Sequence, residues 1–475
     1  MPRYLAFDLG AESGRAIVGT VAGGRVGIEE VHRFPNRQVS EAGHLHWDVP
    51  YLFGEIKKGL ARAIAGGDLT SIGIDSWGVD FALVGANGEL REPPFSYRDG
   101  RTDGVMPRVF AKMSREEIFA ATGTQCMQIN SLFQLYAALR GEPRGFDAST
   151  RLLFIADLFN FLLTGVQCSE YTLATTSQML NASRREWDRE LFARLGLPLG
   201  LMAPIIQPGS VIGAVSPAVL RDVGAAKPVN VVAVGCHDTA SAVAAVPASG
   251  ENWAFLSSGT WSVIGTELDG PILTADALTE GFGNEGGVGG RIRFLRNVMG
   301  MWLLEELRRG WQREGKAYGH DDIARLASGT GKAGAIIDPD DMAFLNPADM
   351  AGAIRAHCTR TGQRVPKTDG EVVRCVLESL ALKYGAVLET LGRVTRRRVA
   401  RLHIVGGGSR NDLLNQMTAD ACGVPVAAGP AEATALGNIM VQAMADGEVA
   451  SVVEGRELIR RSFPVKEFRP NDQGR

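Results

Sequence analysis

The sequence predicts an α/β protein built from two domains. The chain has 475 residues, which is too long for one ordinary hydrophobic core and suits two large domains. Residues 231–242, VVAVGCHDTASA, have the pattern of a buried strand, a tight turn and a helix. A strand–turn–strand pattern occurs once in each half, as YLAFDLGAESGRAIVG and NWAFLSSGTWSVIG. This repetition favours a duplicated domain, with two unrelated hairpins as the alternative.

The first half of the chain alternates strand and helix patterns. Residues 4–19 read as strand, glycine-rich turn and strand, with a third strand around 26–31. Asp48 is expected to cap a helix over 49–65. The stretch 71–84 is predicted to be a strand pair. Further helices are predicted over 114–122, 131–140 and 187–195, and the strand RLLFI at 151–155 precedes a buried helix.

A turn-rich break, VPASGEN, follows Ala245 and predicts a boundary between domains at 1–245 and 246–475. Beyond it, a strand around 290–296 leads into a predicted helix over 296–311. Apolar residues at helical spacing predict a long core helix over 371–395. The strand RLHIV then runs into Gly406–Gly408, followed by a helix over 411–422 and a last helix that begins near Ala433. The polar tail beyond Phe468 is expected to be frayed.

Composition excludes several classes of function. A net charge of -3 gives no basic surplus for nucleic acid and no polybasic run for a membrane surface. The amino terminus shows no secretory signal pattern. The six cysteines form no CxxC pair, which favours a reducing, cytoplasmic setting; Cys358 and Cys375 are the one pair with a prospect of a bridge. The assembly is expected to be a monomer or a small homo-oligomer.

Three turns rich in glycine and hydroxyl groups predict phosphate binding. They are 11–14, 257–260 and 406–408, each at a strand end. Glycine lets the backbone approach a charged ligand, and free amide N–H groups bind phosphate. The P-loop, the dinucleotide fingerprint, zinc signatures and the serine-hydrolase elbow are all missing from the sequence. Phosphate-binding turns and carboxylates remain, and they favour phosphoryl transfer.

Two carboxylates are candidates for that chemistry. Asp238 is predicted at the carboxyl end of a strand, where α/β folds bind ligands, and could serve as general base. The alternative is that Asp238 caps the helix while His237 fills the turn. Asp8 interrupts an apolar strand, where a lone carboxylate needs a partner, and could hold Mg²⁺ through water.

With these features, the chain resembles the FGGY carbohydrate kinases over about residues 4–465. The matching stretches are FDLGAESGR, IDSWGVDF, YRDGRT, GCHDTASAV, LSSGTWS, NEGG, RNVMGMWLLE, LHIVGGGSRNDLLNQMTADACGVPV and GPAEATALGN. Within the family, HDTASAV beside DSWGVDF points to the members that act on L-rhamnulose. The resemblance implies two RNase H-like domains of the actin-like ATPase type, with an active-site cleft between them that closes on substrates.

The resemblance also implies a reaction and its residues. The γ-phosphoryl group of ATP would pass to the 1-hydroxyl of L-rhamnulose, with Mg²⁺ and with Asp238 as the base. The implied sugar-binding residues are Gly78, His237, Asp238, Thr239 and Asn297, with Arg98 as a further sugar contact. The implied ATP-binding residues are Ala11, Glu12, Ser13, Gly14, Arg15, Thr260, Glu305 and Gly407.

Two residues depart from the family pattern. Glu12 stands where relatives carry a small polar residue, and its carboxylate would repel phosphate unless it pairs with Arg15 or points away. Glu305 stands where relatives carry a neutral amide. Two other functions stay open: a kinase for another ketose such as L-fuculose or xylulose, and a sugar- and nucleotide-binding regulator without turnover. The intact Asp8 and Asp238 argue against the regulator.

Overall fold

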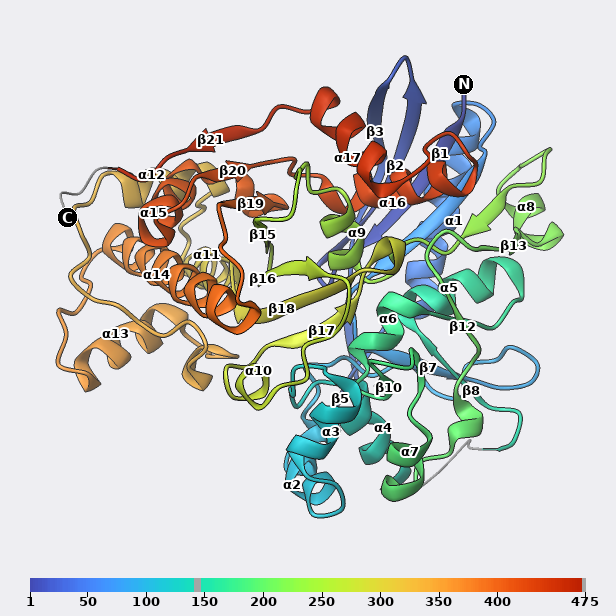
Figure 1. Ribbon diagram of the computed structural model, residues 1–475, viewed down its shortest axis with the longest axis horizontal. Coiled ribbons are helices and arrows are strands. Elements are labelled where there is room, and N and C mark those ends of the chain that lie inside the picture. Colours follow the sequence, from blue (N-terminus) through green and yellow to red (C-terminus); the bar gives the residue numbers. More distant parts are fainter. Residues whose placement is uncertain (141–146, 472–475) are drawn as a thin grey trace. The chain divides into compact units, whose positions relative to one another are not determined.

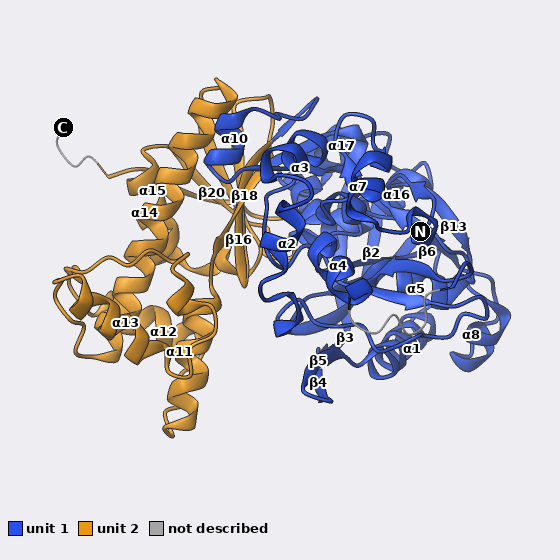
Figure 2. Ribbon diagram, turned by 90° about the horizontal axis from the view of Figure 1, so that it is seen from below, with its two compact units in different colours: residues 1–247, 267–294, 433–462 blue, residues 248–266, 295–432, 463–475 orange. Residues whose placement is uncertain are grey.

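A computed structural model describes residues 1–140 and 147–471, which form two compact units (Figure 1). Unit 1 comprises residues 1–247, 267–294 and 433–462, and unit 2 comprises 248–266, 295–432 and 463–475 (Figure 2). These units interleave along the chain, whereas the division at 245 and 246 separates continuous halves. That division therefore stays a prediction.

Unit 1 is built on a six-stranded sheet with the strand order β13-β14-β6-β1-β2-β3. Strand β1 pairs antiparallel with β2 and parallel with β6, and β6 pairs parallel with β14. The predicted hairpin at 4–19 and its third strand are thereby confirmed. The strands are β1 (Arg3–Leu9), β2 (Ser13–Ala22), β3 (Arg25–Pro35), β6 (Ser71–Ser76), β13 (Val211–Ala214) and β14 (Asn230–Val232).

Helices cover both faces of this sheet. Helix α1 (Val49–Ala65) packs where Gly59 lies against Phe7, and α16 (Ala433–Ala445) packs where Ile439 lies against Gly19. Gly19 is paired with Tyr4, so its face is opposite that of Phe7. Asp8 alternates with Phe7 and therefore shares the face that α16 covers. Helices α5 (Ile155–Thr164), α9 (Asp238–Ala244) and α17 (Val452–Ser462) complete the packing around this sheet.

The remainder of unit 1 consists of short elements. Asp48 caps α1 by accepting a hydrogen bond from the Tyr51 amide at 3.1 Å, as expected. The strands are β4 (Gln38–Glu41), β5 (His44–Trp47), β7 (Phe81–Val84), β8 (Arg151–Phe154), β9 (Ser169–Glu170), β10 (Leu180–Asn181), β11 (Glu186–Trp187) and β12 (Ile205–Ile206). The helices are α2 (Val105–Phe110), α3 (Arg115–Thr122), α4 (Ser131–Arg140), α6 (Tyr171–Thr176), α7 (Arg189–Leu195), α8 (Pro217–Asp222) and α10 (Ala275–Thr279).

A seven-stranded sheet, ordered β17-β18-β16-β15-β19-β20-β21, carries most strands of unit 2. Its strands are β15 (Trp253–Ser258), β16 (Trp261–Leu268), β17 (Gly283–Gly286), β18 (Ile292–Met299), β19 (Arg401–Val405), β20 (Val426–Ala428) and β21 (Lys466–Phe468). The helices of unit 2 are α11 (Trp302–Arg313), α12 (His320–Ser328), α13 (Met350–Arg360), α14 (Asp369–Thr395) and α15 (Asp412–Cys422). The long predicted core helix is α14, whose apolar stripe is buried.

Three expected elements differ in the structure. β6 and β7 do not pair with each other, because β6 joins the main sheet and β7 pairs with β8. The helix predicted over 296–311 starts only at Trp302, since 296–299 continue strand β18. Helix α16 is followed by α17, so the helix near Ala433 is not the last. The tail residues 472–475 lie outside the described residues.

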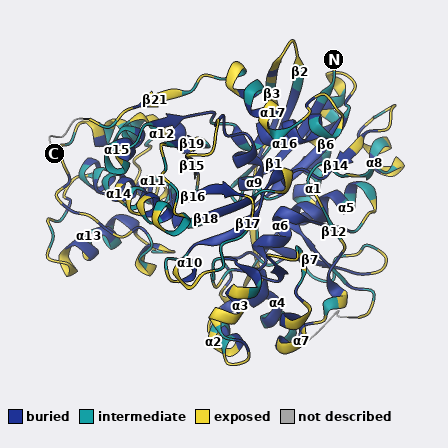
Figure 3. Cartoon of the chain, viewed as in Figure 1, coloured by how far each residue is buried: buried dark blue, intermediate teal, exposed yellow. Residues whose placement is uncertain are grey.

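Burial follows the two sheets, whose central strands are dark in Figure 3. In β1, Tyr4, Leu5, Ala6 and Phe7 are fully buried. All six cysteines are free thiols, Cys358 and Cys375 included. Within residues 1–140 and 147–471, no helix is both long enough and apolar enough to cross a membrane.

Candidate active site in unit 1 and glycine-rich turns in unit 2

The turn between β14 and α9 brings Asp238 to the end of the unit 1 sheet. Ser76 at the end of β6 donates its backbone N–H to the Cys236 carbonyl at 2.8 Å, which extends the pairing of β6 beyond β14. His237 stands at the N-cap position of α9 and Asp238 is the first helical residue. The predicted strand–turn–helix stretch is therefore present, with a carboxylate at its turn.

Asp238 is partly open to solvent, with 31% of its side chain exposed. Its Oδ1 accepts hydrogen bonds from the Thr239 backbone N–H and from the Thr239 hydroxyl, the latter at 3.0 Å. The N-cap residue of α9 is His237 and no side-chain hydrogen bond caps this helix, so the expected capping role of Asp238 is wrong. Enclosure by the protein raises the pKa of Asp238, and the charge of Asp8 adds to this shift.

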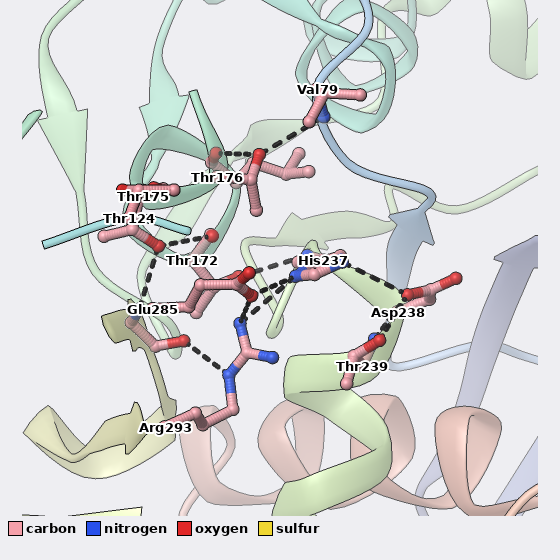
Figure 4. A network of polar contacts seen from close by, with 12 residues as sticks. Val79, Thr124, Thr172, Thr175, Thr176, His237, Asp238, Thr239, Glu285 and Arg293 are labelled. Atoms are coloured by element: carbon pink, nitrogen blue, oxygen red, sulfur yellow. Dashed lines mark hydrogen bonds and ion pairs between the residues drawn. The ribbon is translucent and has the colours of Figure 1, made fainter. Parts of the chain in front are cut away.

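His237 lies between Asp238 and a buried ion pair (Figure 4). Its Nε2 lies 3.5 Å from Asp238 Oδ1. Its Nδ1 lies 3.2 Å from Glu285 Oε2 and 3.1 Å from Arg293 Nη2. Arg293 is fully buried and donates from Nη2 to Glu285 Oε2 at 3.0 Å. Burial raises the pKa of Glu285, but the charge and the hydrogen bond of Arg293 oppose this, and the net shift is downward.

Helix α6 holds the backbone of this turn. The backbone N–H of His237 donates to Thr172 Oγ1 at 3.1 Å, and that of Cys236 donates to Glu170 Oε2 at 3.2 Å. Burial raises the pKa of Glu170 to about 7, although hydrogen bonds from Thr172, Leu173 and Cys236 oppose the shift. The position of the Asp238 turn is thus set by residues about 65 positions earlier in the chain.

The loop after β6 is strained at Val79, directly after the predicted sugar residue Gly78. Val79 has φ = 68°, a left-handed conformation that a β-branched residue rarely adopts. Its N–H donates to Thr176 Oγ1 at 3.2 Å and its carbonyl accepts from Ser131 Oγ at 2.5 Å. A Cβ at position 78 would lie 3.1 Å from Thr176 Oγ1. The loop therefore favours a small residue at Gly78, and its strained shape points to a functional constraint.

Asp80 stabilises the same loop through hydrogen bonds to its carboxyl group. It is fully buried and accepts hydrogen bonds from Trp47 Nε1 at 2.7 Å, Trp77 Nε1 at 3.0 Å and Gln134 Nε2 at 2.9 Å. Burial raises its pKa to about 6 despite these donors. Both of its oxygens accept hydrogen bonds from protein groups, which gives Asp80 a structural role. Arg98, the further sugar candidate, lies with its guanidinium 5.2 Å from the centre of the Tyr97 ring.

The first of the turns predicted to bind phosphate, between β1 and β2, is closed by hydrogen bonds to its backbone. Gly10 N–H donates to the Ser13 carbonyl at 3.0 Å, and Asn36 Nδ2 donates to the Gly10 carbonyl at 2.9 Å. The predicted ATP residues Ala11, Glu12, Ser13, Gly14 and Arg15 lie on this turn and on the first residues of β2. Arg15 forms an ion pair with Asp8, its neighbour in the antiparallel ladder.

Asp8 also faces Asp75 across the parallel ladder between β1 and β6. Asp75 is fully buried; Asn438 Nδ2 donates to its Oδ2 at 2.6 Å, while its Oδ1 has no hydrogen-bond partner. Burial raises the pKa of Asp75 well above its usual value, and the charge of Asp8 adds to this shift. An unpartnered buried oxygen calls for a water or an ion.

This group of carboxylates suits Mg²⁺ held largely through water. Mg²⁺ keeps several waters and commonly takes one or two carboxylates together with substrate phosphates. Within residues 1–140 and 147–471, no three His, Cys, Asp or Glu side chains form a ready-made metal cage. Asp8 and Asp75, neighbours in the ladder, provide the one or two carboxylates that Mg²⁺ takes when it binds together with substrate phosphates.

In unit 2, the turn that carries Thr260 joins β15 to β16. The carbonyl of Thr260 accepts from the backbone N–H of Gly300 at 3.3 Å and of Trp302 at 3.2 Å. Gly300 approaches so closely that a Cβ there would lie 2.9 Å from the Gly259 carbonyl oxygen. This close approach ends β18 and opens α11, which explains why the predicted helix begins later than expected.

The second glycine-rich turn of unit 2 follows β19. Gly406 has φ = 83°, and a Cβ there would lie 2.9 Å from the Ser258 carbonyl oxygen. A Cβ on Gly408 would clash with the Ser258 side chain, whereas one on Gly407 would meet nothing within 4 Å. Two glycines are thus required for packing, while Gly407 presents open backbone, as a phosphate-binding residue would.

Asn297 and Glu305 also belong to unit 2. Asn297 lies on strand β18 rather than on the predicted helix. Glu305 lies in the first turn of α11 and accepts hydrogen bonds from Arg308 at 2.9 and 3.1 Å. His320 Nδ1 lies 3.4 Å from its other oxygen. This pairing offsets the negative charge that made Glu305 an unusual candidate beside a nucleotide.

The structure thus divides the predicted residues between the units and adds several that sequence reasoning missed. Unit 1 holds Asp8, Ala11–Arg15, Gly78 and His237–Thr239, and unit 2 holds Thr260, Asn297, Glu305 and Gly407. Glu285 and Arg293 were not assigned a role. The available signal was Arg293 inside the apolar strand RIRFL, since a charge in such a strand must be paired.

Comparisons with known proteins address the family. The family model for the N-terminal domain of the FGGY family of carbohydrate kinases matches residues 3–245, and the model for its C-terminal domain matches residues 254–445. The chain belongs to the FGGY family of carbohydrate kinases. The family resemblance stated from the sequence is confirmed.

Curated FGGY relatives match nearly the whole chain. A rhamnulokinase from Bacteroides thetaiotaomicron is 46% identical over 470 residues, covering 99% of this chain and 96% of the relative. A rhamnulokinase from Oceanobacillus iheyensis is 40% identical over 462 residues, covering 97% of each chain.

Solved FGGY structures confirm the predicted fold. A ligand-bound xylulose kinase from Lactobacillus acidophilus superposes with a TM-score of 0.80 at 16% identity, covering 100% of this chain and 94% of that one. A Plasmodium falciparum glycerol kinase with ADP superposes with a TM-score of 0.78 at 15% identity, covering 100% and 95%. The chain therefore has the two-domain α/β fold of the actin-like ATPase type.

Proposed function

We propose that this protein transfers the γ-phosphoryl group of ATP to the 1-hydroxyl of L-rhamnulose, giving L-rhamnulose 1-phosphate and ADP. The observation that carries this proposal is 46% identity to a rhamnulokinase across 99% of the chain. Within a family of carbohydrate kinases, similarity of this extent favours a shared substrate over the other ketoses, L-fuculose and xylulose. The site in unit 1 supplies the carboxylate that such a reaction needs.

Asp238 is proposed as the general base. In phosphoryl transfer the protein mainly positions the reactants and stabilises charge, and a carboxylate accepts the proton of the attacking hydroxyl. Asp238 is partly exposed and held at the start of α9 by Thr239. The sugar alcohol loses its proton to Asp238, its oxygen bonds to the γ-phosphorus, and the bond from that phosphorus to the bridging oxygen breaks to release ADP.

The sugar is proposed to contact the unit 1 residues Gly78, His237, Asp238 and Thr239, and Asn297 of unit 2. His237 can form a hydrogen bond with a sugar hydroxyl, and Gly78 has no side chain that would fill the sugar site. The loop of Gly78 is held in place by the hydrogen bond from the Val79 N–H to Thr176 Oγ1. A braced loop loses little conformational entropy when a ligand binds, which favours affinity.

ATP is proposed to contact the backbone of Ala11–Arg15 in unit 1 and Thr260, Glu305 and Gly407 in unit 2. The open backbone at Gly407 supports its assignment. Mg²⁺, when bound with ATP, would offset phosphate charge. Asp8 would hold it through water, and Asp75 supplies an additional carboxylate oxygen beside it.

The reducing cytoplasm, where ATP is available, is the proposed location, since all six cysteines are free thiols. A monomer or a small homo-oligomer without nucleic acid or membrane partners is proposed, in keeping with the net charge of -3.

A coupled assay of ADP release over a panel of ketoses tests the proposal. L-Rhamnulose is expected to give the highest kcat/KM, with L-fuculose and xylulose well below it. Robust turnover of xylulose without turnover of L-rhamnulose would overturn the substrate assignment. Binding of sugar and nucleotide without ADP release would instead favour the non-catalytic regulator.

A further inference from the structure

The side of His237 that faces away from Asp238 is occupied by two opposite charges. Arg293 Nη2 lies 3.1 Å from His237 Nδ1, and Glu285 Oε2 lies 3.2 Å from the same nitrogen. Both charged side chains are almost fully enclosed, at 0% exposure for Arg293 and 7% for Glu285. His237 Nε2, on the other side of the ring, lies 3.5 Å from Asp238 Oδ1. Figure 4 shows this chain of contacts.

The two charges make different demands on His237 Nδ1. A guanidinium can only donate hydrogen bonds, so a bond from Arg293 requires Nδ1 to carry no proton. A bond to Glu285 requires the opposite, an Nδ1 that carries a proton and donates it. Arg293 Nη2 already donates one hydrogen to Glu285 Oε2 at 3.0 Å, which leaves its second hydrogen for Nδ1. A protonated Nδ1 would place two donors head to head at 3.1 Å.

The strand that carries Glu285 is held in place around this contact. Gly286 N–H donates to Thr175 Oγ1 at 2.8 Å, and the Gly286 carbonyl accepts from Arg293 Nε at 2.8 Å. Thr124 Oγ1 in turn donates to the Thr175 carbonyl at 3.0 Å. The guanidinium is therefore fixed by two of its nitrogens, and its orientation toward Nδ1 does not depend on a flexible side chain.

We propose that Arg293 and Glu285 are positioning residues for Asp238, acting through His237. Arg293 donates to Nδ1 and so selects the neutral Nε2–H tautomer, which directs an N–H toward Asp238. Glu285 balances the buried charge of Arg293 and holds the guanidinium in register. The second nitrogen of a histidine ring commonly decides which tautomer the first presents. This inference rests on the proposed function insofar as Asp238 is the base.

A long-range ¹H–¹⁵N correlation spectrum of protein labelled with ¹⁵N-histidine tests the tautomer directly. The pattern of these correlations distinguishes the two neutral tautomers and the imidazolium. The His237 signals are identified as those absent from His237→Asn. At neutral pH without substrates, His237 is expected as the Nε2–H tautomer. An imidazolium or an Nδ1–H tautomer would overturn the proposal.

Two single variants make opposite predictions. Arg293→Gln removes the obligatory donor, so His237 Nδ1 is expected to take up a proton and donate to Glu285. Glu285→Gln keeps that donor, so the Nε2–H tautomer is expected to remain. Arg293→Gln is also expected to lower kcat at least about tenfold, in the range seen when a supporting hydrogen bond is lost. An unchanged tautomer or an unchanged kcat in Arg293→Gln would contradict the assignment.

Unit 1 offers a matched control in a second buried ion pair. Arg456 Nη2 donates to Glu267 Oε2 at 2.8 Å and to the Val243 carbonyl at 3.0 Å, and Arg456 Nε donates to the Ala244 carbonyl at 3.2 Å. Glu267→Gln breaks a pair of similar burial without touching His237, so the tautomer and kcat are expected to stay near native. An equal loss of kcat in Glu267→Gln would reduce the effect at Arg293 to general destabilisation and overturn the positioning role.

Two further measures keep the outcomes separate. Breaking one partner of a buried pair is strongly destabilising, whereas removing both charges is far better tolerated. The double variant Arg293→Gln/Glu285→Gln therefore carries the tautomer measurement if Arg293→Gln does not fold, and is expected to lose the fixed Nε2–H state. Since kcat is measured with whichever ketose the native enzyme turns over, failure of the L-rhamnulose assignment does not affect this result.

Discussion

The two sheets share one strand arrangement but differ sharply in chemistry. In unit 1, β1 pairs antiparallel with β2 and parallel with β6. In unit 2, β15 pairs antiparallel with β16 and parallel with β19. Strands β1 and β15 both contain the dipeptide Ala-Phe, at 6–7 and 254–255, so the two strands can be aligned residue by residue.

The residue after that dipeptide shows the difference. In unit 1 it is Asp8, which faces Arg15 on one neighbouring strand and Asp75 on the other. In unit 2 it is Leu256, which faces Ile264 and Ile404. One rung across three strands is thus charged in the first sheet and aliphatic in the second. A packed core prefers the aliphatic rung, so the charged rung indicates function.

The turns that follow β14 and β20 repeat the contrast. After β14 comes GCHDT with Asp238, and after β20 comes GPAEA with Glu432. Glu432 lies in the turn before α16 and accepts a hydrogen bond from Arg410 at 2.9 Å. Asp238 is the first residue of α9, and its described partners are His237 and Thr239. The acid of unit 2 is thus paired with an arginine, whereas the acid of unit 1 is the one proposed as general base.

The largest expected effect comes from exchanging these two acids for amides. Asp238→Asn is expected to lower kcat by at least about 10² while ATP and sugar still bind, because the general base is lost. Glu432→Gln is the matched change in unit 2 and is expected to keep kcat within about tenfold. Steady-state kinetics with calorimetric binding measures both. Near-native turnover by Asp238→Asn would refute both the general-base role of Asp238 and its functional difference from Glu432.

A smaller effect is expected from the charged rung. Asp8→Asn removes the carboxylate proposed to face Mg²⁺, so half-maximal activity is expected to need about 10–100 times more Mg²⁺. Leu256→Met changes the counterpart residue in unit 2 at similar volume and is expected to leave the Mg²⁺ requirement unchanged. Titration of activity with Mg²⁺ at saturating substrates gives the answer. A native-like curve for Asp8→Asn would remove Asp8 from the metal site.

The smallest expected effect concerns stability and pH. Among the described residues, every carboxyl with a raised pKa lies in unit 1: Asp75, Asp80, Asp157, Glu170 and Asp238. Burial raises the pKa of Asp157 well above its usual value, so its contribution to stability is full below about pH 4 and is lost as pH rises. Asp157→Asn is neutral at every pH and keeps an oxygen for the Glu170 N–H.

The Asp157→Asn variant is therefore expected to be more stable than the native protein at pH 8, by on the order of 1 kcal/mol, with the gain shrinking toward pH 4. Unit 2 supplies a control of opposite sign. Hydrogen bonds from Lys367 and Thr368 lower the pKa of Glu371, so its contribution is present at neutral pH and lost on acidification. Urea midpoints between about pH 3 and pH 8 for Asp157→Asn and Glu371→Gln measure both, and a pH-independent difference for Asp157→Asn would refute the assignment of its pKa.

Much of the local structure could be predicted because it depends on short-range patterns. The turn at 235–239 and the helix over 49–65 follow from runs of apolar residues and from capping by Asp48. Strand β18 was cut short in prediction, because the apolar pattern of 296–304 suits either a strand or a helix. Only the approach of Gly300 to Gly259 separates the two elements.

The sequence by itself determined the family, the α/β class and the candidates Asp8 and Asp238, since each is visible as a local pattern or as a charge in an apolar strand. Only the tertiary structure decided which buried groups surround them. Asp75 meets Asp8 through a parallel pairing across 67 positions, and Arg293 meets His237 across 56. Such contacts depend on how strands and helices are placed in space, and no spacing along the chain encodes them.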